Sequence, residues 1–316
     1  MTGSSPGANP VASRPKPQKF RSVRVMRTRA PFLLGCPAWS VPEWRGNFLP
    51  AGAKRADFLG LYGRVFNTVE GNSTFYALAS PDTARRWTTE VPPEFEFCFK
   101  MPRDITHGAG LLTNRSAVRA FIDILRIFAE AGQIGPAFLQ VHASFGPDRL
   151  TELSRFLEQW PRDLPLAVEV RHPAFFQEGD DEARLEDLLR KEEIDRVIFD
   201  SRALYHSAPD DSVEAVSQTR KPRLPVRWRA TGKRPFLRLV GRNLWEKTTP
   251  WLNEAAEVTA GWLEDGLRPC LFMHAPDDVL APLLCRRFHE ALRRLRPEIP
   301  ELDYEAPHRG EQLELF

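Results

Sequence analysis

A chain of 316 residues is long enough for one large domain or two ordinary ones. Its composition, 42% hydrophobic and 27% charged, is typical of a globular protein and excludes a chain that is disordered throughout. The 44 basic residues nearly balance the 42 acidic ones, so the net charge of +2 does not indicate binding to nucleic acid through overall charge.

The N-terminal segment is rich in Pro, Ser and Gly and lacks the apolar stretch of a secretory signal, which predicts a flexible tail over residues 1–30. No apolar run approaches the ~20 residues that a membrane-spanning helix needs. The four cysteines are far apart and form no CxxC pair, which argues against a zinc knuckle or a redox motif and fits a reducing compartment. We therefore expect a cytoplasmic protein.

Eight short runs of apolar residues along the chain are typical of β-strands. They begin at Phe32, Phe66, Phe95, Ala137, Leu166, Arg196, Phe236 and Cys270. Successive runs start about 30 to 40 residues apart, which leaves room for a helix and two loops in each interval, as in a βαβ unit. Eight such units predict an α/β fold, a single (β/α)8 TIM-type barrel over residues 31–300, followed by a C-terminal tail over residues 301–316.

The helical period is visible in several of the intervals. Asn114 is a good N-cap, and apolar residues at helical spacing follow it until Gly132. Asp278 is expected to cap a last helix that ends before Pro297.

The interval between Asp200 and Pro235 differs from the others, because its only helix-like piece lies near Asp210–Ser217. Its basic residues are Arg202, Arg220, Lys221, Arg223, Arg227, Arg229, Lys233 and Arg234. One interpretation is an ordinary solvated connection. The other is a basic rim for an anionic substrate, since the segment leaves the carboxyl end of a strand, where barrel active sites lie.

Polar residues gather at the ends of the predicted strands, which meet at one mouth of a barrel. The candidate catalytic residues are Glu70, Lys100, Glu169 and Asp200, and the candidate substrate-binding residues are Trp39, Asn72, Thr74, Tyr76, Arg171, His172 and Arg238. Gln140, His142 and His274 also lie near strand ends. Two carboxylates facing a Lys and an Arg would perturb each other's protonation, the usual basis for acid and base roles, although the same groups can be structural ion pairs.

A metal centre is conceivable, because the possible ligands are His142, His172, His274, Asp200 and the glutamates, but their spacing does not support one. No HxH or HExxH spacing is present, and Lys100 and Arg171 would oppose a cation near the glutamates. The GxSxG, GxGxxG and GxxxxGK[ST] motifs are absent as well. No metal ligands are therefore predicted, and the cofactor is left open.

Several segments carry a resemblance to a known family. They are "GCPAWSVPEWRGNFLP", "FNTVEGNSTFYALASPDTARRW", "FCFKMPRDITH", "LAVEVRHPAFF" and "VIFDSR". From about Leu34 to Met273 the chain resembles the YecE-like family, also described as domain of unknown function 72. The resemblance implies a TIM-type barrel without an assigned reaction. It also implies a polar cluster made of Glu70, Asn72, Thr74, Lys100, Glu169, Arg171 and Asp200.

The last residues, "EQLELF", resemble the peptide by which bacterial replication and repair proteins dock on the sliding clamp. Gln312 would supply directional hydrogen bonds, while Leu313, Leu315 and Phe316 would fill an apolar pocket. The alternative is a tail that packs on its own domain or on a second copy of the chain.

The leading hypothesis is a hydrolase-like enzyme that acts on a phosphate-bearing or nucleic-acid-derived substrate and is recruited to the clamp. Lys100 and Arg171 would hold the anion, while Glu70 and Glu169 would act as general acid and base. A glycosidase is the second hypothesis, because paired carboxylates with aromatic platforms suit it. The third is a non-catalytic adaptor that binds the clamp and a ligand.

Overall fold

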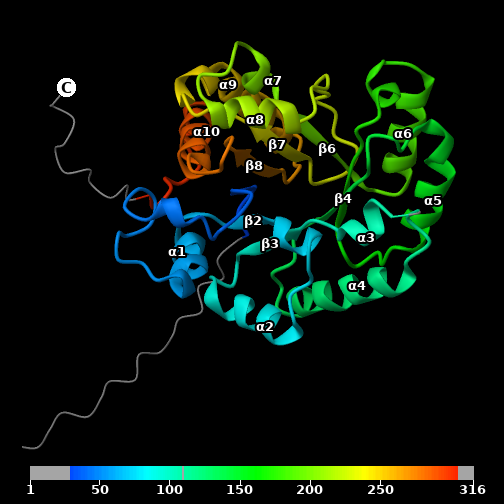
Figure 1. Ribbon diagram of the computed structural model, residues 1–316, viewed down its shortest axis with the longest axis horizontal. Coiled ribbons are helices and arrows are strands. Elements are labelled where there is room, and N and C mark those ends of the chain that lie inside the picture. Colours follow the sequence, from blue (N-terminus) through cyan, green and yellow to red (C-terminus); the bar gives the residue numbers. More distant parts are fainter. Residues whose placement is uncertain (1–28, 109, 305–316) are drawn as a thin grey trace, which may run out of the picture.

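The computed structural model describes residues 29–108 and 110–304. The predicted N-terminal tail, apart from Arg29 and Ala30, lies outside these residues, and so does the motif Gln312–Phe316. Strands and helices alternate along the chain, with the strands at the centre and the helices around them (Figure 1). The strands in the described residues are β1 (Leu33–Gly35), β2 (Thr68–Gly71), β3 (Glu96–Phe99), β4 (Ala137–Gln140), β5 (Leu166–Glu169), β6 (Asp195–Asp200), β7 (Phe236–Val240) and β8 (Cys270–His274). All eight predicted strand runs therefore contain a strand.

Helices follow most of the strands. The α-helices of the described part of the chain are α1 (Phe58–Val65), α2 (Pro81–Glu90), α3 (Arg103–Thr106), α4 (Arg115–Glu130), α5 (Leu150–Gln159), α6 (Asp180–Lys191), α7 (Arg202–Tyr205), α8 (Ser212–Arg220), α9 (Thr249–Glu264) and α10 (Ala281–Leu295). Short 3-10 helices are η1 (Pro42–Trp44), η2 (Arg55–Asp57), η3 (Asn72–Phe75), η4 (Pro147–Arg149), η5 (Pro173–Phe176) and η6 (Trp245–Thr248).

Two predicted helix starts have different outcomes. The side chain of Asn114 accepts a hydrogen bond from the amide of Ala117 at 3.1 Å, so the predicted cap of α4 is confirmed. The predicted cap at Asp278 is wrong, because α10 begins at Ala281 and Asp278 itself has a positive φ of 63°. Its carboxylate accepts instead from the amide of Ala275 at 3.3 Å, closing a turn before the helix.

The predicted closed eight-stranded barrel is wrong. The strands form two parallel sheets, one of six strands in the order β1-β8-β7-β6-β5-β4 and one of two strands, β2-β3. Between β3 and β4, the described residues show only isolated bridges, Phe97 to Ile134 and Lys100 to Phe138. Between β1 and β2, a backbone bond from the amide of Glu70 to the carbonyl of Cys36, at 3.0 Å, does not make a ladder.

Side chains take the place of the missing ladder between β1 and β2. The amide group of Asn67 accepts from the backbone N–H of Leu34 at 2.9 Å and donates to the carbonyl of Phe32 at 3.0 Å. The hydroxyl of Tyr62 likewise joins the N–H of Cys36 to the carbonyl of Thr68, at 2.7 Å each. Because these groups satisfy the backbone of β1, a continuous ladder is not needed to bury it.

The two sheets nevertheless enclose one apolar layer. Its buried members are Leu33, Cys98, Phe138, Ala167, Val197, Phe236, Cys270 and Phe272. A larger apolar cluster fills the space between the strands and the helices, where α4 contributes Phe121, Leu125 and Phe128. The strands are short and buried on both faces, as expected when helices cover a parallel sheet.

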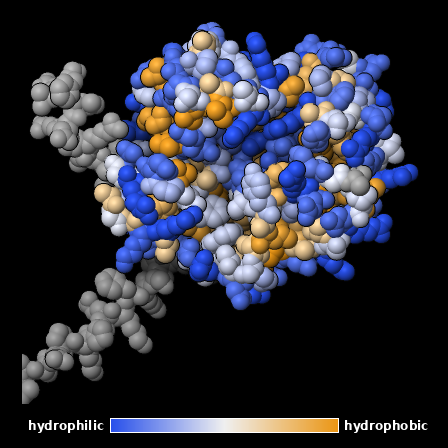
Figure 2. Space-filling model, in the orientation of Figure 1, coloured by the Kyte–Doolittle hydropathy of each residue, from blue (hydrophilic) through white to orange (hydrophobic). Residues whose placement is uncertain are grey.

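The viewed face of the molecule is largely hydrophilic, with apolar patches that are separate from one another (Figure 2). Among the described residues, no helix has both the length and the apolar character to span a bilayer. The four cysteines are unpaired and buried. A cytoplasmic location stays a prediction.

Candidate functional site

The alternation of side chains along the strands builds the candidate site. Successive residues of a strand point to opposite faces, so residues two apart share a face. On six strands, the residue two positions after a member of the apolar layer therefore lies on the same face as that member. These residues are Lys100, Gln140, Glu169, Phe199, Arg238 and His274. Glu70 joins them at the equivalent place on β2. The site therefore lies at the carboxyl ends of the strands of both sheets.

Arg238 on β7 is the centre of this cluster. Its guanidinium donates to both oxygens of Glu70, at 2.7 and 2.8 Å, and to Glu169 at 2.5 Å. All three side chains are almost completely buried. Glu70 also accepts from the side-chain amide of Asn72 at 2.7 Å and lies 3.2 Å from Nε2 of His274. One guanidinium thus holds the ends of β2, β5 and β7 together.

Arg171 lies next to this centre and is partly exposed. It donates through Nε to Glu169 at 2.8 Å and through Nη2 to the side-chain oxygen of Gln140 at 3.0 Å. Since Glu169 is shared by Arg171 and Arg238, the carboxylate has a hydrogen bond on each oxygen. The guanidinium of Arg171 is therefore paired with Glu169 and still partly accessible to a molecule above the strands.

The two glutamates are held in their ionised form. Burial raises the pKa of Glu70, but the adjacent Arg238 and His274 outweigh it and hold that pKa well below its ordinary value. Burial also raises the pKa of Glu169. The positive charges of Arg238, Arg171 and Lys100 outweigh burial and lower this pKa to about 2. A carboxylate of this kind is a poor general acid at neutral pH.

Lys100 differs from the arginines of the cluster in its protonation and its lack of an ion pair. Burial lowers its pKa, and Arg238 lowers it further. Glu169 and Glu70 raise the pKa but do not offset these two effects, so the pKa is about 8. Its Nζ lies 4.1 Å from the centre of the Phe75 ring. With the described residues, this ammonium group forms neither a hydrogen bond nor an ion pair.

A pocket of ≈ 720 Å³ opens above these groups. Its polar walls include Lys100, Arg171, Arg220, Lys221, Arg238 and His274, with Asp277 and Asp278 as the acidic members. The apolar part of the wall has Tyr76 on one side, 82% exposed, and Val213 and Val216 of α8, 38% and 47% exposed. A molecule in this pocket therefore meets both cationic groups and apolar surface.

The structure brings most of the predicted site residues together. Glu70, Asn72, Lys100, Glu169, Arg171 and Arg238 belong to the cluster, and Tyr76 lies at the edge of the pocket. Thr74 is buried, and its hydroxyl lies 2.9 Å from the carbonyl of Gly71 and 2.6 Å from that of Lys100, a supporting position behind the wall.

Three predicted site residues lie elsewhere. Asp200 follows Phe199 by one residue, so it points to the opposite face, where it accepts from Arg202 at 2.9 Å. His172 accepts from the amide of Ala174 at 3.2 Å at the start of η5 and does not line the pocket. Trp39 packs edge-on against Trp87, 5.0 Å between ring centres, and lines a different hollow.

Asp278 lines the pocket although it was expected only as a helix cap, while Arg220 and Lys221 were expected only as part of the basic rim. Lys221 follows α8 and is half-buried. Burial lowers its pKa most, and the positive charge of Arg238 lowers it further. Burial raises the pKa of Asp278. Two signals pointed to them, namely the basic connection after β6 and the "HAPDD" run after β8.

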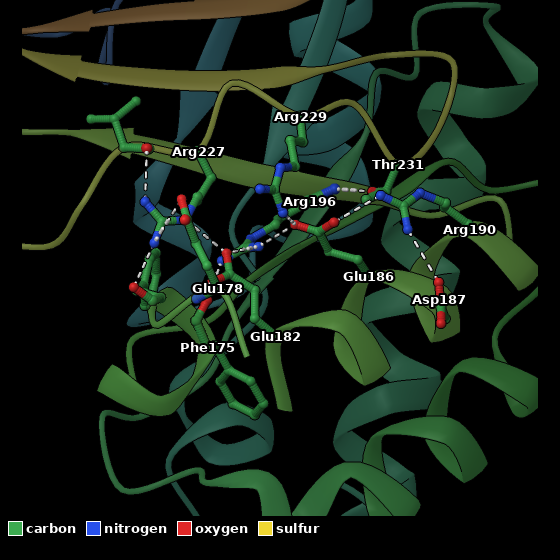
Figure 3. A network of polar contacts seen from close by, with 12 residues as sticks. Phe175, Glu178, Glu182, Glu186, Asp187, Arg190, Arg196, Arg227, Arg229 and Thr231 are labelled. Carbon is green, nitrogen blue, oxygen red and sulfur yellow. Dashed lines mark hydrogen bonds and ion pairs between the residues drawn. The ribbon is translucent and has the colours of Figure 1, made fainter. Parts of the chain in front are cut away.

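Ion pairs with α6 hold two further basic residues of that connection, Arg227 and Arg229, outside the pocket (Figure 3). Arg196 on β6 donates to Glu182 at 3.0 Å and to Glu186 at 2.8 Å, both on α6. Arg227 donates to Glu182 at 2.9 Å, and Arg229 to Glu186 at 3.4 Å. Of the basic residues in this connection, Arg220 and Lys221 line the pocket, so the predicted basic rim is reduced to these two.

Other buried contacts hold α8 itself in place. Arg242 is fully buried and donates to Glu214 of α8 at 2.7 Å and to Asp210 at 3.0 Å. The amide of Asn243 donates to the second oxygen of Glu214 at 2.8 Å. The helix that carries this wall of the pocket is thus attached to the end of β7.

The described ranges, 29–108 and 110–304, contain no group of three or more His, Cys, Asp or Glu side chains placed to hold a metal ion. The histidine and carboxylates of the cluster are occupied by each other and by Arg238.

The fold and site define a parallel α/β protein with a polar pocket at the carboxyl ends of its strands. The family described as "Protein of unknown function DUF72" matches residues 33–308, and the chain belongs to this family. The chain is 35% identical over 266 residues to the UPF0759 protein YecE of Escherichia coli K12, covering 84% of this chain and 94% of that protein. The same protein of Escherichia coli O157:H7 matches with equal identity and coverage.

Two solved structures share the fold. A DUF72 family protein of Enterococcus faecalis V583 superposes with a TM-score of 0.63 at 16% identity, covering 89% of this chain and 99% of that one. A DUF72 family protein of Thermotoga maritima MSB8 gives a TM-score of 0.62 at 21% identity, with 83% and 99% covered. At these identities the likeness concerns the fold alone.

Proposed function

We propose that the pocket binds a small phosphate-bearing molecule. The observation that carries the proposal is a set of three cations in the wall, Lys100, Arg220 and Lys221, whose charged groups form no ion pair with a carboxylate of the described residues. Arg171 adds a partly exposed guanidinium. Against them stand Asp277 and Asp278, and burial raises the pKa of Asp278. Cations that are not paired with a carboxylate attract an anion, and phosphate offers oxygens for several of them at once.

The size and lining of the pocket fit a compound larger than inorganic phosphate. Small-molecule sites commonly have volumes of ~300–1,000 Å³, a range that includes this one. Tyr76 and Phe75 offer aromatic surface next to the cations. A nucleotide, a sugar phosphate or a nucleic-acid-derived fragment has the matching combination of charge and ring.

The ion pairs and the pocket bear on the three functional hypotheses made from the sequence, two reactions and an adaptor. Hydrolysis with Glu70 and Glu169 as acid and base stays untested, and the low pKa of both groups does not favour it. Direct pairing of both glutamates with Arg238, and of Glu169 with Arg171, argues against a glycosidase. The non-catalytic adaptor, which would bind the clamp and a ligand, stays untested; a mouth filled by its own side chains would favour it, and a pocket of ≈ 720 Å³ does not.

Isothermal titration calorimetry with glycerol 3-phosphate tests the proposal. The intact protein is expected to bind it, and Lys221→Ala is expected to weaken binding at least tenfold, because a half-buried cation at the ligand is lost. Lys54→Ala, on an exposed loop, is the matched control and should bind like the wild type. Absence of binding, or equal affinity in Lys221→Ala and wild type, contradicts the proposal.

We further propose that Gln312, Leu313, Leu315 and Phe316 recruit the protein to a bacterial sliding clamp. The support is the sequence pattern, a Gln followed by apolar side chains, which suits an extended peptide in an apolar groove. Capture of the intact chain and of a chain lacking the last five residues on immobilised clamp tests it. Equal retention of the two chains contradicts it.

A further inference from the structure

We propose that Lys100 is an amine nucleophile that forms an imine with the carbonyl carbon of a phosphate-bearing aldehyde or ketone. This inference rests on the proposed function, because it places a phosphorylated compound in the same pocket. It adds a chemical class of substrate and a covalent step. Lysine amines perform this chemistry in proteins when the surroundings keep part of them neutral.

The backbone of Lys100 is held firmly. Its N–H donates to the carbonyl of Gly71 at 3.2 Å, and the hydroxyl of Thr74 lies 2.6 Å from its carbonyl. A bridge to Phe138 joins the same residue to β4. The base of the side chain is therefore fixed at the strand end, while Nζ lies over the Phe75 ring and faces the pocket.

The carboxylates that would normally keep a lysine protonated are already engaged. Glu70 and Glu169 give their hydrogen-bonding oxygens to Arg238 and Arg171. The amine of Lys100 thus lies beside two guanidinium groups without an ion pair of its own among the described residues. Burial and Arg238 bring its pKa to about 8, so about half of the amine is neutral at pH 8.

The pocket has a second amine, Lys221, which follows α8 rather than a strand. Burial and Arg238 lower its pKa too, but Asp278 and Glu70 act against the change. Lys221 sits beside Arg220 at the end of α8, a pair suited to hold a phosphate group. These positions assign the phosphate to the α8 wall and the carbonyl carbon to Lys100 on the strand.

The step is balanced without an oxidant or a reductant. The lone pair of the neutral amine attacks the carbonyl carbon, forming the C–N bond while the π electrons of C=O move to oxygen, which takes up a proton. The resulting carbinolamine loses its hydroxyl group together with a second proton as water, and the nitrogen lone pair closes the C=N bond. Amine and carbonyl thus give imine and water.

Reductive trapping tests the inference. The intact protein is incubated at pH 8 with glyceraldehyde 3-phosphate and sodium cyanoborohydride, and the modified lysines are mapped by peptide mass spectrometry. The expected adduct is on Lys100, at least tenfold more than with unphosphorylated glyceraldehyde at the same concentration. Lys100→Arg, which keeps the charge but is not nucleophilic, should lose this adduct.

The outcomes separate this inference from the proposed function. An adduct on Lys221 instead of Lys100, or an even distribution that includes the exposed Lys54, overturns the inference. Equal labelling by glyceraldehyde with and without its phosphate overturns it too. If glycerol 3-phosphate, which has no carbonyl, binds in calorimetry while no adduct forms on Lys100, the imine is wrong and the phosphate pocket stands. If neither occurs, both are wrong. Because mapping uses the wild-type protein, it does not depend on folding of the variant.

Discussion

Arg238 compensates two buried carboxylates with one guanidinium. It forms a two-bond pair with Glu70 and a single bond with Glu169, and Arg171 supplies the remaining positive charge. Removing one partner of a buried ion pair leaves charge without compensation in a low dielectric, which costs far more than an exposed pair contributes. The residue is therefore more important for the folded state than for contact with a ligand.

Arg238→Met should lower the free energy of unfolding by about 3–5 kcal/mol, since methionine keeps the volume but not the charge. Urea denaturation at pH 7 measures the change. The matched control is Arg286→Met, whose partner Glu290 lies one turn away on α10 in a partly exposed pair, with an expected loss below ~1 kcal/mol. A loss for Arg238→Met as small as that of the control would refute this role.

Glu169 makes stability dependent on acid. Its pKa in the folded protein, about 2, lies below the ordinary value of 4.5, so its stabilising contribution is complete above pH 4.5 and is lost as pH falls toward 2. Glu169→Gln lacks this group. The difference in unfolding free energy between wild type and Glu169→Gln should therefore narrow as pH falls from 4.5 to 2, as measured by urea denaturation at several pH values. A difference independent of pH would disagree with an ionised, paired Glu169.

At the scale of elements, α8 connects stability to the pocket. A polar connection was predicted after β6, and its helix-like piece near Asp210–Ser217 is found as α8, Ser212–Arg220. The fully buried pair of Glu214 and Arg242 attaches the helix, and its far end carries Arg220 and Lys221. The sequence did not reveal this anchoring, because Arg242 lies beyond the next strand.

Glu214→Gln is expected to weaken binding of glycerol 3-phosphate about tenfold, because loss of the ion pair loosens the helix that carries Lys221. Calorimetry measures the affinity, and circular dichroism confirms that the variant is folded. Thr219→Ala, exposed on the same helix, should leave the affinity unchanged. Equal affinities of Glu214→Gln and Thr219→Ala would show that the anchor does not act on the pocket.

The positions of strands were predictable because apolar runs between turn residues define them locally. Whether the sheet closes was not predictable, because closure depends on which groups form hydrogen bonds with the backbone N–H and C=O groups at each sheet edge. Asn67 and Tyr62 satisfy the edge of β1 with side-chain atoms, and no period in the sequence distinguishes this use of an Asn or a Tyr from any other. The start of α10 was misplaced for a related reason, since Asp278 closes a turn with its own backbone neighbours.

At the scale of the whole molecule, the gathering of distant polar residues was predictable from parallel strands alone. Parallel strands with regular crossovers place their carboxyl ends together, so Glu70, Lys100, Glu169 and Arg238 meet although long stretches of chain separate them. The face of the sheet on which each residue lies is harder to predict, because a shift of one residue along the strand moves a side chain to the opposite face. Asp200 was assigned to the pocket by its place at a strand end and lies on the other face.

Pairing among the gathered residues was not predictable. The sequence placed two glutamates, a lysine and two arginines in one region, but the number of hydrogen bonds that each guanidinium makes depends on distances. In the folded chain Arg238 and Arg171 form the ion pairs with the glutamates, so Lys100 has no ion pair among the described residues. This distribution moves the expected chemistry from the carboxylates to the amine.

The most direct measurement is a crystal structure of the intact protein soaked with glycerol 3-phosphate. The phosphate group is expected in the ≈ 720 Å³ pocket, within hydrogen-bonding distance of Lys221 or Arg220, with the carbon chain directed toward Lys100. Ordered phosphate only at other surfaces, with this pocket filled by water alone, would contradict the account.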